Sequence, residues 1–555
     1  MTTKNLLFPI QYSQLFSDPA PELCELFKFF TKEELVKFAF NLTNNPRYLT
    51  GWKNLCSDIF ASSGDKKAVE LIYTKLQPSQ FGSHSLSGQH TGVELQRQIF
   101  SCNSFATALD IPDEKKEWSL FLIVLIVNDI ISLPLDTESI APNDDYAVAY
   151  AGILTSLPCE DLLNFHPNSL LIHAYKAQQL LYFCSKHPSL SALVDEFCKE
   201  HSCSCINEYL HFMGDIFTRI FSGGMQGFCK LTTYSEEKNI QEFYNKKFRS
   251  LAFPISETIS LSNNTDYKFF RAKPIVEICD SEYLVLCPTF LVNCLYNSIK
   301  FSLAGIAKQK RIKVDVNRIL TLEFTEHKLL YALLKDSVYP AAKHVTGKKC
   351  DEEKIDGAPD YYIRNGADIF LFELKDYRLA AELRETPNKA AIDDYITNRL
   401  VDKGNNKNGA VLQLISNISL ICKDKFLPDS NIKRIKNIYP ILVFGEASFV
   451  SNGISNLLNK EFKAALSNIS IPGNINIHDL LVVDIDCLIQ FYNLLTSKKV
   501  KLKQLIKEYD SFINHKTKLK SIVEVLHTLT ISFSTFLRYY MDNYSEGFDP
   551  TKIRI

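Results

Sequence analysis

Two short apolar segments joined by a tight-turn signal, PDYYIRNGADIFLFELK at residues 359–375, constrain the fold of this chain most. The pair Asn365-Gly366 predicts a β-hairpin, because both residues tolerate positive φ in a two-residue turn. The return segment, from Ile369 to Lys375, is apolar on both faces up to Glu373. Such a run is typical of a strand inside a sheet, so we expect an α/β protein built around this hairpin.

The hairpin register decides which charged side chains share a face. A two-residue turn at Asn365-Gly366 pairs Asp360 with Leu371 and makes Asp360 a diagonal neighbour of Glu373, with their Cβ atoms about 7 Å apart. Lys375 follows Glu373 by two residues and therefore points to the same face. Two carboxylates at this separation suit one hard cation. Charges on a buried strand are costly unless they pair or bind something.

The pair Pro359-Asp360, followed after twelve residues by Glu373-Leu374-Lys375, resembles the motif of the PD-(D/E)xK phosphodiesterase superfamily of restriction-type and repair nucleases. By that resemblance Asp360 and Glu373 hold Mg²⁺, for which Mn²⁺ can substitute, and the backbone carbonyl of Leu374 completes the shell. Lys375 then orients or activates the attacking water. Asp356 is the alternative to Asp360 as a ligand. The competing interpretation, an ordinary surface hairpin, disagrees with the apolar run that precedes Glu373.

Segments on both sides of the hairpin match the αβββαβ core that the superfamily has. Arg318 to Lys335 predicts an amphipathic helix, and Val338 to Val345 a first strand. Ala410 to Cys422 predicts a helix after the hairpin, and two apolar runs, Ile438–Phe444 and Leu480–Ile485, suit buried parallel strands. The charged stretch between the hairpin and that helix, residues 376–409, is expected to be mobile.

The resemblance also nominates two further residues. A helix acid faces the metal in many members, and Glu326 best fits that place, with Glu323 as the alternative. Related nucleases carry a Gln in the helix after the hairpin, which Gln413 matches, but Asn417 stands where one branch has Tyr. A solvated helix glutamate and an ordinary polar residue on a packed helix are the competing interpretations.

The chain has 555 residues, more than one core accommodates. We expect a mainly helical N-terminal domain over 1–230, a small mixed α/β connecting region over 231–310, a PD-(D/E)xK nuclease domain over 311–490 and a helical C-terminal extension over 491–555. Residues 300–520 carry nine more Lys and Arg than Asp and Glu, and the rest carry ten fewer. Attraction to phosphate is therefore expected to be local.

Apolar runs and cysteine positions indicate the cellular location and the metal content to expect. We expect no signal peptide, because Met1-Thr-Thr-Lys lacks a following apolar core and a cleavage site. The longest apolar run, Trp118 to Val127, is too short to span a bilayer and predicts a buried helix. Fifteen Cys in no paired framework suit a reducing cytoplasm. The cluster Cys198, His201, Cys203 and Cys205 lacks the distant second pair of a zinc site, so thiols at a helix junction are the favoured interpretation.

These observations lead to an expected function. We expect a Mg²⁺-dependent phosphodiesterase, an endonuclease rather than an exonuclease, that acts on DNA in preference to RNA. The helical N-terminal half would bind a protein partner or a second copy and regulate the nuclease, as in prokaryotic anti-phage defence. The alternative is a catalytically silent nuclease-like module that binds nucleic acid or organises an assembly. No GxxxxGK[ST] loop is present, so an NTP motor is not expected.

Overall fold

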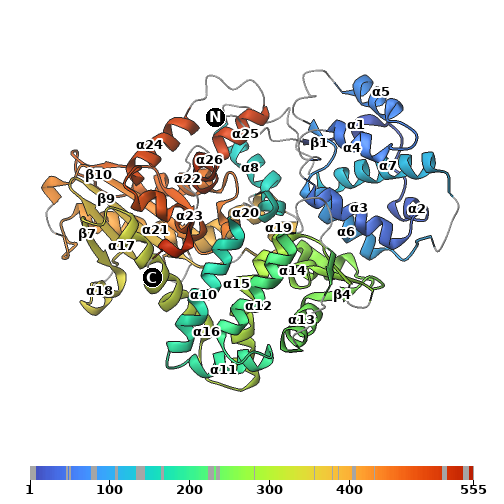
Figure 1. Cartoon of the computed structure of the whole chain (residues 1–555). Coiled ribbons are helices and arrows are strands. Elements are labelled where there is room, and N and C mark those ends of the chain that lie inside the picture. The colour runs from blue at the N-terminus through green and yellow to red at the C-terminus, as the bar shows by residue number, and fades with distance from the viewer. Residues whose placement is uncertain are drawn as a thin grey trace. The chain divides into compact units, whose positions relative to one another are not determined.

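The computed structural model divides the chain into two compact units. Unit 1 comprises residues 1–135 and 181–312, and unit 2 comprises residues 136–180 and 313–555; Figure 1 shows both. The structure describes residues 8–45, 48, 52–76, 84–106, 111–132, 144–163, 168–222, 230–232, 238–279, 282–355, 357–377, 379–385, 387–402, 408–429, 432–514, 522–541 and 549–553.

In its described residues, unit 1 consists of helices and two small sheets. One sheet is the parallel pair of β1 (Phe8–Pro9) and β2 (His84–Ser85). The other has the strand order β3–β6–β5–β4, in which β4 and β5 are parallel and the other pairs are antiparallel. The strands are β3 (Lys230–Thr232), β4 (Ala252–Pro254), β5 (Ile275–Cys279) and β6 (Glu282–Val285). The longer helices are α3 (Lys32–Asn44), α4 (Trp52–Ile59), α5 (Lys66–Lys75), α6 (Gln89–Ser101), α7 (Asp113–Ile131), α11 (Ser191–Glu200), α12 (Ile206–Ser222), α13 (Lys238–Leu251) and α15 (Pro288–Gln309).

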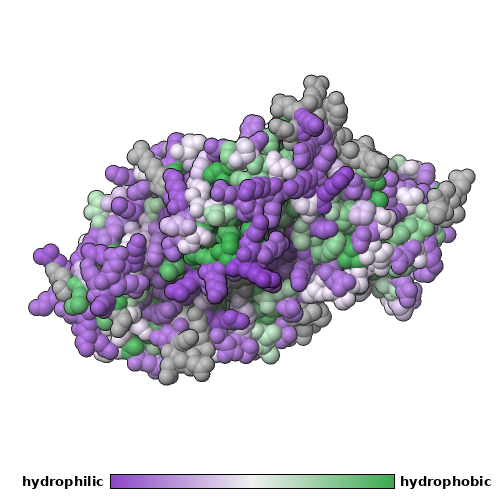
Figure 2. All heavy atoms as spheres, turned by 90° about the horizontal axis from the view of Figure 1, so that it is seen from below, coloured by the Kyte–Doolittle hydropathy of each residue, from purple (hydrophilic) through white to green (hydrophobic). Residues whose placement is uncertain are grey.

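Two apolar helices of unit 1 bear on the question of a membrane. The run from Trp118 to Val127 lies in α7, and most of its apolar side chains are buried, as the sequence predicted. Within the described ranges, α15 is the one helix whose length and composition would allow it to cross a bilayer, and half of its most apolar stretch is buried. A long core helix has the same properties. Hydrophilic residues cover most of the face drawn in Figure 2.

Unit 2 is built around one mixed sheet. Strands β7, β8 and β9 form an antiparallel meander, and β10 then joins β9 in parallel and pairs with both β11 and β12. The strands are β7 (Lys343–Thr346), β8 (Tyr361–Asn365), β9 (Asp368–Lys375), β10 (Asn437–Phe444), β11 (Asn476–Ile477) and β12 (Leu481–Asp484). Six of the eight residues of β9 are buried, so β9 is an interior strand, as its apolar run predicted.

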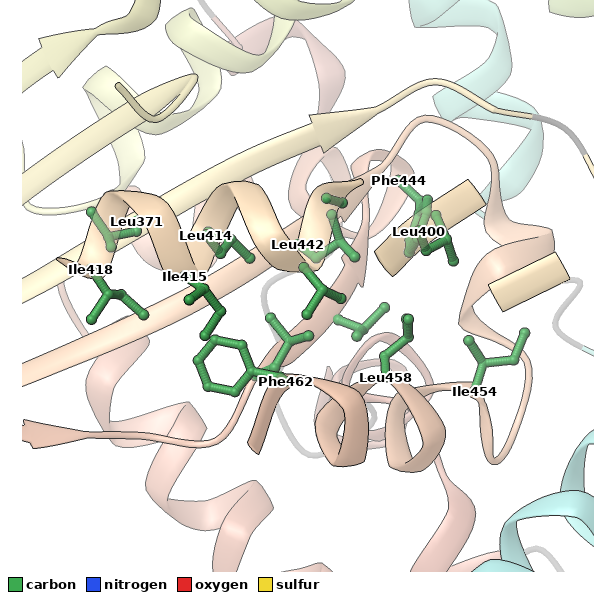
Figure 3. Close-up of a cluster of buried hydrophobic side chains, with 14 of the residues drawn as sticks. Leu371, Leu400, Leu414, Ile415, Ile418, Leu442, Phe444, Ile454, Leu458 and Phe462 are labelled. Carbon is green, nitrogen blue, oxygen red and sulfur yellow. The ribbon is translucent and has the colours of Figure 1, made fainter. Parts of the chain in front are cut away.

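Helices cover both faces of this sheet. Side chains of Ile369 and Leu371 in β9 join a buried cluster with α21 (Ala410–Cys422) and α22 (Ile454–Leu466), which Figure 3 shows. On the other face the ring of Phe370 packs against those of Tyr339 and Tyr439. The remaining helical segments include α16 (Val316–Ile319), the π-helical segment η5 (Leu320–Leu330), α17 (Tyr331–Ser337), α18 (Gly347–Glu352), α23 (Ile485–Thr496), α24 (Leu502–Ile513), α25 (Ile522–Thr530) and α26 (Phe533–Met541).

The hairpin register differs from the prediction by two residues. Asn365 pairs with Asp368, so the turn residues are Gly366 and Ala367, and of these two only Gly366 has positive φ, at 65°. A turn with Gly in the first central position needs just one residue in that region. The pairing that ends at Tyr361 and Phe372 therefore places Asp360 directly opposite Glu373 rather than diagonal to it. A shift of two residues preserves the face of every side chain.

Two segments differ from what the sequence suggested, one in its secondary structure and one in the unit to which it belongs. Residues 376–409, expected to be a mobile stretch, contain α19 (Ala381–Glu385), α20 (Lys389–Ile396) and a further π-helical turn, η6 (Thr397–Val401), and Leu400 is buried in the core of unit 2. Residues 136–180, expected in the N-terminal domain, also belong to unit 2, where α8 (Asp145–Ser156) packs against α22 and α25. Its Gly152 allows the close approach, because a Cβ there would lie 2.7 Å from Thr530 Oγ1. Local periodicity does not say which partner a helix covers.

Candidate active site

Three residues of the predicted motif meet at one edge of the unit 2 sheet. Asp360 directly precedes β8, and Glu373 and Lys375 lie at the carboxyl end of β9. The antiparallel pairing of these strands brings the start of one beside the end of the other. The side chains of Glu373 and Lys375 share a face because they are two residues apart.

Asp360 is held by the backbone on both sides. Its Oδ2 accepts a hydrogen bond of 2.6 Å from the amide of Leu374, and its carbonyl accepts one of 2.7 Å from the amide of Gly347. A Cβ at Gly347 would lie 3.1 Å from the Cα of Asp360, so glycine permits this close approach. Burial raises the pKa of Asp360, against the lowering effects of Lys375 and of the Leu374 amide.

Glu373 and Lys375 form a buried ion pair. Lys375 Nζ lies 2.6 Å from Glu373 Oε1, and their side chains are 11% and 3% exposed. Burial is the main cause that raises the pKa of Glu373 to about 8, and the nearby Asp360 adds to it, whereas Lys375 opposes the shift. Burial alone would lower the pKa of Lys375, but Glu373 and Asp360 raise it overall. The negative charge that the two carboxylates can carry therefore exceeds the positive charge of the one ammonium group at this site.

Glu326, proposed from the helix before the sheet, belongs to this group. Its side chain is 13% exposed, and its Oε1 accepts a 2.8 Å hydrogen bond from the hydroxyl of Tyr331. Burial raises the pKa of Glu326 to about 8, and the negative charge of Asp360 contributes, while Tyr331 and Lys375 act in the opposite direction. The alternative, Glu323, instead lies close enough to His327 to influence the pKa of that side chain.

The oxygen atoms at this edge suit a hard divalent cation. Lys375 O accepts from Gly445 N at 3.0 Å, on the β10 side. Because successive residues of a strand direct their backbone groups to opposite neighbours, the carbonyl of Leu374 faces the side of Asp360. Two carboxylates and one carbonyl are the ligands that Mg²⁺ takes, with water completing its shell. Throughout the described ranges, no three His, Cys, Asp or Glu side chains converge as a metal-binding group, so the carbonyl and water would have to supply the remaining ligands.

Gln413 lies on α21, the helix that packs against the face carrying Glu373 and Lys375. Its Oε1 is buried without a hydrogen-bond partner, and so is Nδ2 of Asn417, one helical turn further along. A buried polar atom without a partner is costly, and the role of Gln413 at the site stays a prediction. Asp356, the alternative metal ligand, lies outside the described residues.

Two residues at this edge were missed in the sequence. Tyr331 contacts Glu326, as described, and Asp376 follows Lys375 directly. Asp376 Oδ2 accepts hydrogen bonds from the hydroxyls of Thr321 and Thr325 in η5, at 3.5 and 3.4 Å. The signal for Asp376 in the sequence is its position as an acidic residue directly after the Glu-Leu-Lys motif. The spacing of five between Glu326 and Tyr331 suggests no contact in an α-helix.

Two thiols of the cysteine cluster in unit 1, Cys198 and Cys203, are buried, whereas Cys205 is exposed. Burial raises the pKa of Cys198 to about 11 and that of Cys203 to about 12, so both stay protonated at neutral pH. Burial also lowers the pKa of His201 to about 3. The preference for thiols over a zinc site stays a prediction.

Comparisons with known proteins identify no relative. No family model matches the sequence, and neither a curated protein nor a solved structure matches it. The functional argument therefore rests on the geometry of the site.

Proposed function

We propose that this protein is a metal-dependent endonuclease, which hydrolyses phosphodiester bonds within a nucleic-acid strand and acts on DNA in preference to RNA. The observation that carries the proposal is the convergence of Asp360, Glu373 and Lys375 at one sheet edge, where the first is tied to the backbone of β9 and the other two form a buried ion pair. Buried acids with raised pKa values and a lysine among them are common at catalytic sites.

The order of elements supports the same proposal. Helical segment η5–α17 leads to the meander β7–β8–β9, then to α21, and then to β10 in parallel with β9. This succession agrees with the αβββαβ order expected for a PD-(D/E)xK core. In both arrangements the motif residues lie where the second and third strands meet, so the agreement concerns the site as well as the scaffold.

Each residue would have a separate task in the reaction. Mg²⁺, bound at Asp360, Glu373 and the Leu374 carbonyl, would polarise the phosphate and lower the pKa of a bound water. Lys375, held beside Glu373, would orient the attacking water or stabilise the charge that develops on phosphate. Glu326 would hold a water molecule next to the two metal-binding carboxylates, Asp360 and Glu373. Gln413, whose Oε1 has no hydrogen-bond partner, would orient that water molecule or the substrate.

The surroundings of the site suit a phosphate backbone. Gly347, whose amide bonds to Asp360, is followed by Lys348 and Lys349, and both lysine residues are exposed. The stretch 300–520 carries the local excess of positive charge. Lysines beside a sheet edge would attract nucleic acid of either kind, and the preference for DNA is therefore a matter for direct comparison of substrates.

The decisive experiment measures cleavage of plasmid DNA, single-stranded DNA and both forms of RNA, with Mg²⁺ and with EDTA. We expect Mg²⁺-dependent cutting by the native protein and a loss of roughly 10²- to 10³-fold in Lys375→Ala. Lys503→Ala is the matched control, because Lys503 pairs with Asp368 at the opposite end of β9, also at 2.6 Å. That variant should cut like the native protein.

A folded protein that binds nucleic acid but cuts none of these substrates would favour the silent binding module. Equal cutting by the native protein and Lys375→Ala would refute the role of Lys375. A regulatory role of unit 1 in anti-phage defence and a cytoplasmic location are parts of the same proposal. The fourteen described cysteines carry free thiols, which suits a reducing compartment.

A further inference from the structure

The helix that carries Glu326 has an unusually wide turn. In η5 the backbone bonds join residues five apart, and the amide of Tyr331 donates to the carbonyl of Glu326. The hydroxyl of Thr325 shares its one proton between the carbonyl five residues earlier, Leu320, at 3.0 Å and Asp376 Oδ2 at 3.4 Å. In an α-helix of 3.6 residues per turn, side chains five apart point about 140° away from each other. The wider turn brings them toward one face, and such turns recur at functional sites.

This geometry explains how Tyr331 reaches Glu326. The Tyr331 hydroxyl donates to Glu326 Oε1 at 2.8 Å and accepts from the amide of Lys348 at 3.2 Å. Its ring lies between two others, with centroids 5.3 Å from that of His327 and 5.2 Å from that of Tyr361. Burial and the Glu326 carboxylate raise the pKa of Tyr331. The hydroxyl therefore keeps its proton and remains a donor to Glu326.

We infer that Tyr331 is a positioning residue of the active site, which fixes the Glu326 carboxylate beside Asp360 and Glu373. This inference rests on the proposed nuclease function. A bond to Oε1 restrains the position of that oxygen and so limits the orientations that the carboxylate can take. The partly exposed Glu326 would otherwise sample several rotamers. Because the hydrogen bond already restricts Glu326, less conformational entropy is lost when the site is ordered for reaction.

The same helix also holds the other side of the site. Thr321 and Thr325 bond to Asp376, which directly follows Lys375. The wide turn therefore connects one helix to the end of β9 through the threonines and to Glu326 through Tyr331. Both connections fix side chains that flank Glu373 and Lys375, which is the arrangement expected of a support for catalytic groups.

The test compares Tyr331→Phe with Tyr361→Phe, using the full-length protein. Tyr361 is a suitable control because it is also buried and its ring contacts that of Tyr331. Its hydroxyl, however, bonds to His344 Nδ1 at 3.1 Å and not to a residue of the site. We expect Tyr331→Phe to lower kcat by roughly 10- to 100-fold with little change in KM for DNA. Glu326→Gln should cause a similar loss, and the double variant should be no worse than Glu326→Gln.

Mn²⁺ binding, followed by electron paramagnetic resonance, supplies a readout that does not depend on turnover. We expect weaker Mn²⁺ binding in Tyr331→Phe than in Tyr361→Phe, although both variants lose one buried hydroxyl. Additive losses in the double variant, or equal behaviour of the two tyrosine variants, would overturn the inference while the nuclease proposal stands. Weaker Mn²⁺ binding in Tyr331→Phe, with no cleavage of nucleic acid by the native protein, would refute the nuclease and leave Tyr331 as a residue that supports a metal site. Absence of Mn²⁺ binding in the native protein would overturn both.

Discussion

The carboxylate of Asp360 accepts a 2.6 Å hydrogen bond from the backbone amide of Leu374, the residue between Glu373 and Lys375. This bond spans the two strands beyond their last paired residues, Tyr361 and Phe372. The two halves of the motif, which twelve intervening residues separate in the chain, are therefore joined through the backbone. Because that bond orients Asp360, a cation would meet an acid that is already in place.

The first prediction concerns Asp360→Asn. The amide keeps one oxygen that can accept from Leu374 N, so the fold should be retained, but the charge that would attract a cation is lost. Mn²⁺ at about 100 times its dissociation constant should stabilise the native protein by about 2.7 kcal/mol and should leave the variant unchanged. Thermal unfolding with and without Mn²⁺ measures this. An equal rise in Tm for both proteins would place the cation elsewhere.

The second prediction separates a catalytic Gln413 from a structural one. Its Oε1 is buried without a partner, so Gln413→Leu removes a poorly satisfied polar group. The free energy of unfolding should stay the same or rise by about 1 kcal/mol, whereas cleavage should fall at least tenfold. Urea unfolding and cleavage rates measured on the same preparation give both quantities. Full activity in the variant would return Gln413 to an ordinary helix position.

The third prediction concerns a buried ion pair elsewhere in unit 2. Arg538 donates to both oxygens of Asp484, at 3.3 and 3.1 Å, and Asp484 is fully buried while it also accepts from the amide of Cys487. Arg538→Met should cost about 3 to 5 kcal/mol, because it leaves a buried carboxylate without its partner. Lys463→Met, which breaks an exposed pair with Asp479, should cost less than about 1 kcal/mol. Equal costs in urea unfolding would contradict this.

The fourth prediction concerns pH and Glu160, which is 1% exposed. Burial raises the pKa of Glu160 from its ordinary value near 4.5 to about 8, although Arg538 partly opposes the shift. Between these pH values the folded protein keeps a proton that the unfolded chain releases, so stability falls as pH rises through this window and is constant above it.

Glu160→Gln removes this titration. The variant should lose less stability than the native protein between pH 5 and pH 8, by up to about 4 kcal/mol. Glu353→Gln, at an exposed residue, is the control and should follow the native curve. Parallel curves for all three proteins in urea unfolding would show that Glu160 titrates at its ordinary pKa in the fold.

Residues with strong local patterns could be placed from the sequence. The helix Ala410–Cys422 was predicted to the residue, and strands β9 and β10 were predicted within one residue at their starts, because long apolar runs with clear ends decide these elements. The turn was harder. Asn365-Gly366 and Gly366-Ala367 both satisfy local turn chemistry, and the pairing of Tyr361 with Phe372 in the assembled sheet selects the second.

The sequence by itself determined the type of the elements around β9 and the shared face of Glu373 and Lys375, since alternation along a strand is a local property. Only the tertiary structure decided that Tyr331 reaches Glu326, that Oε1 of Gln413 is buried without a hydrogen-bond partner, and that α8 joins unit 2. These features depend on a wide helical turn and on packing between distant segments. Such contacts are selected by the burial of the whole core, which no local window of residues contains.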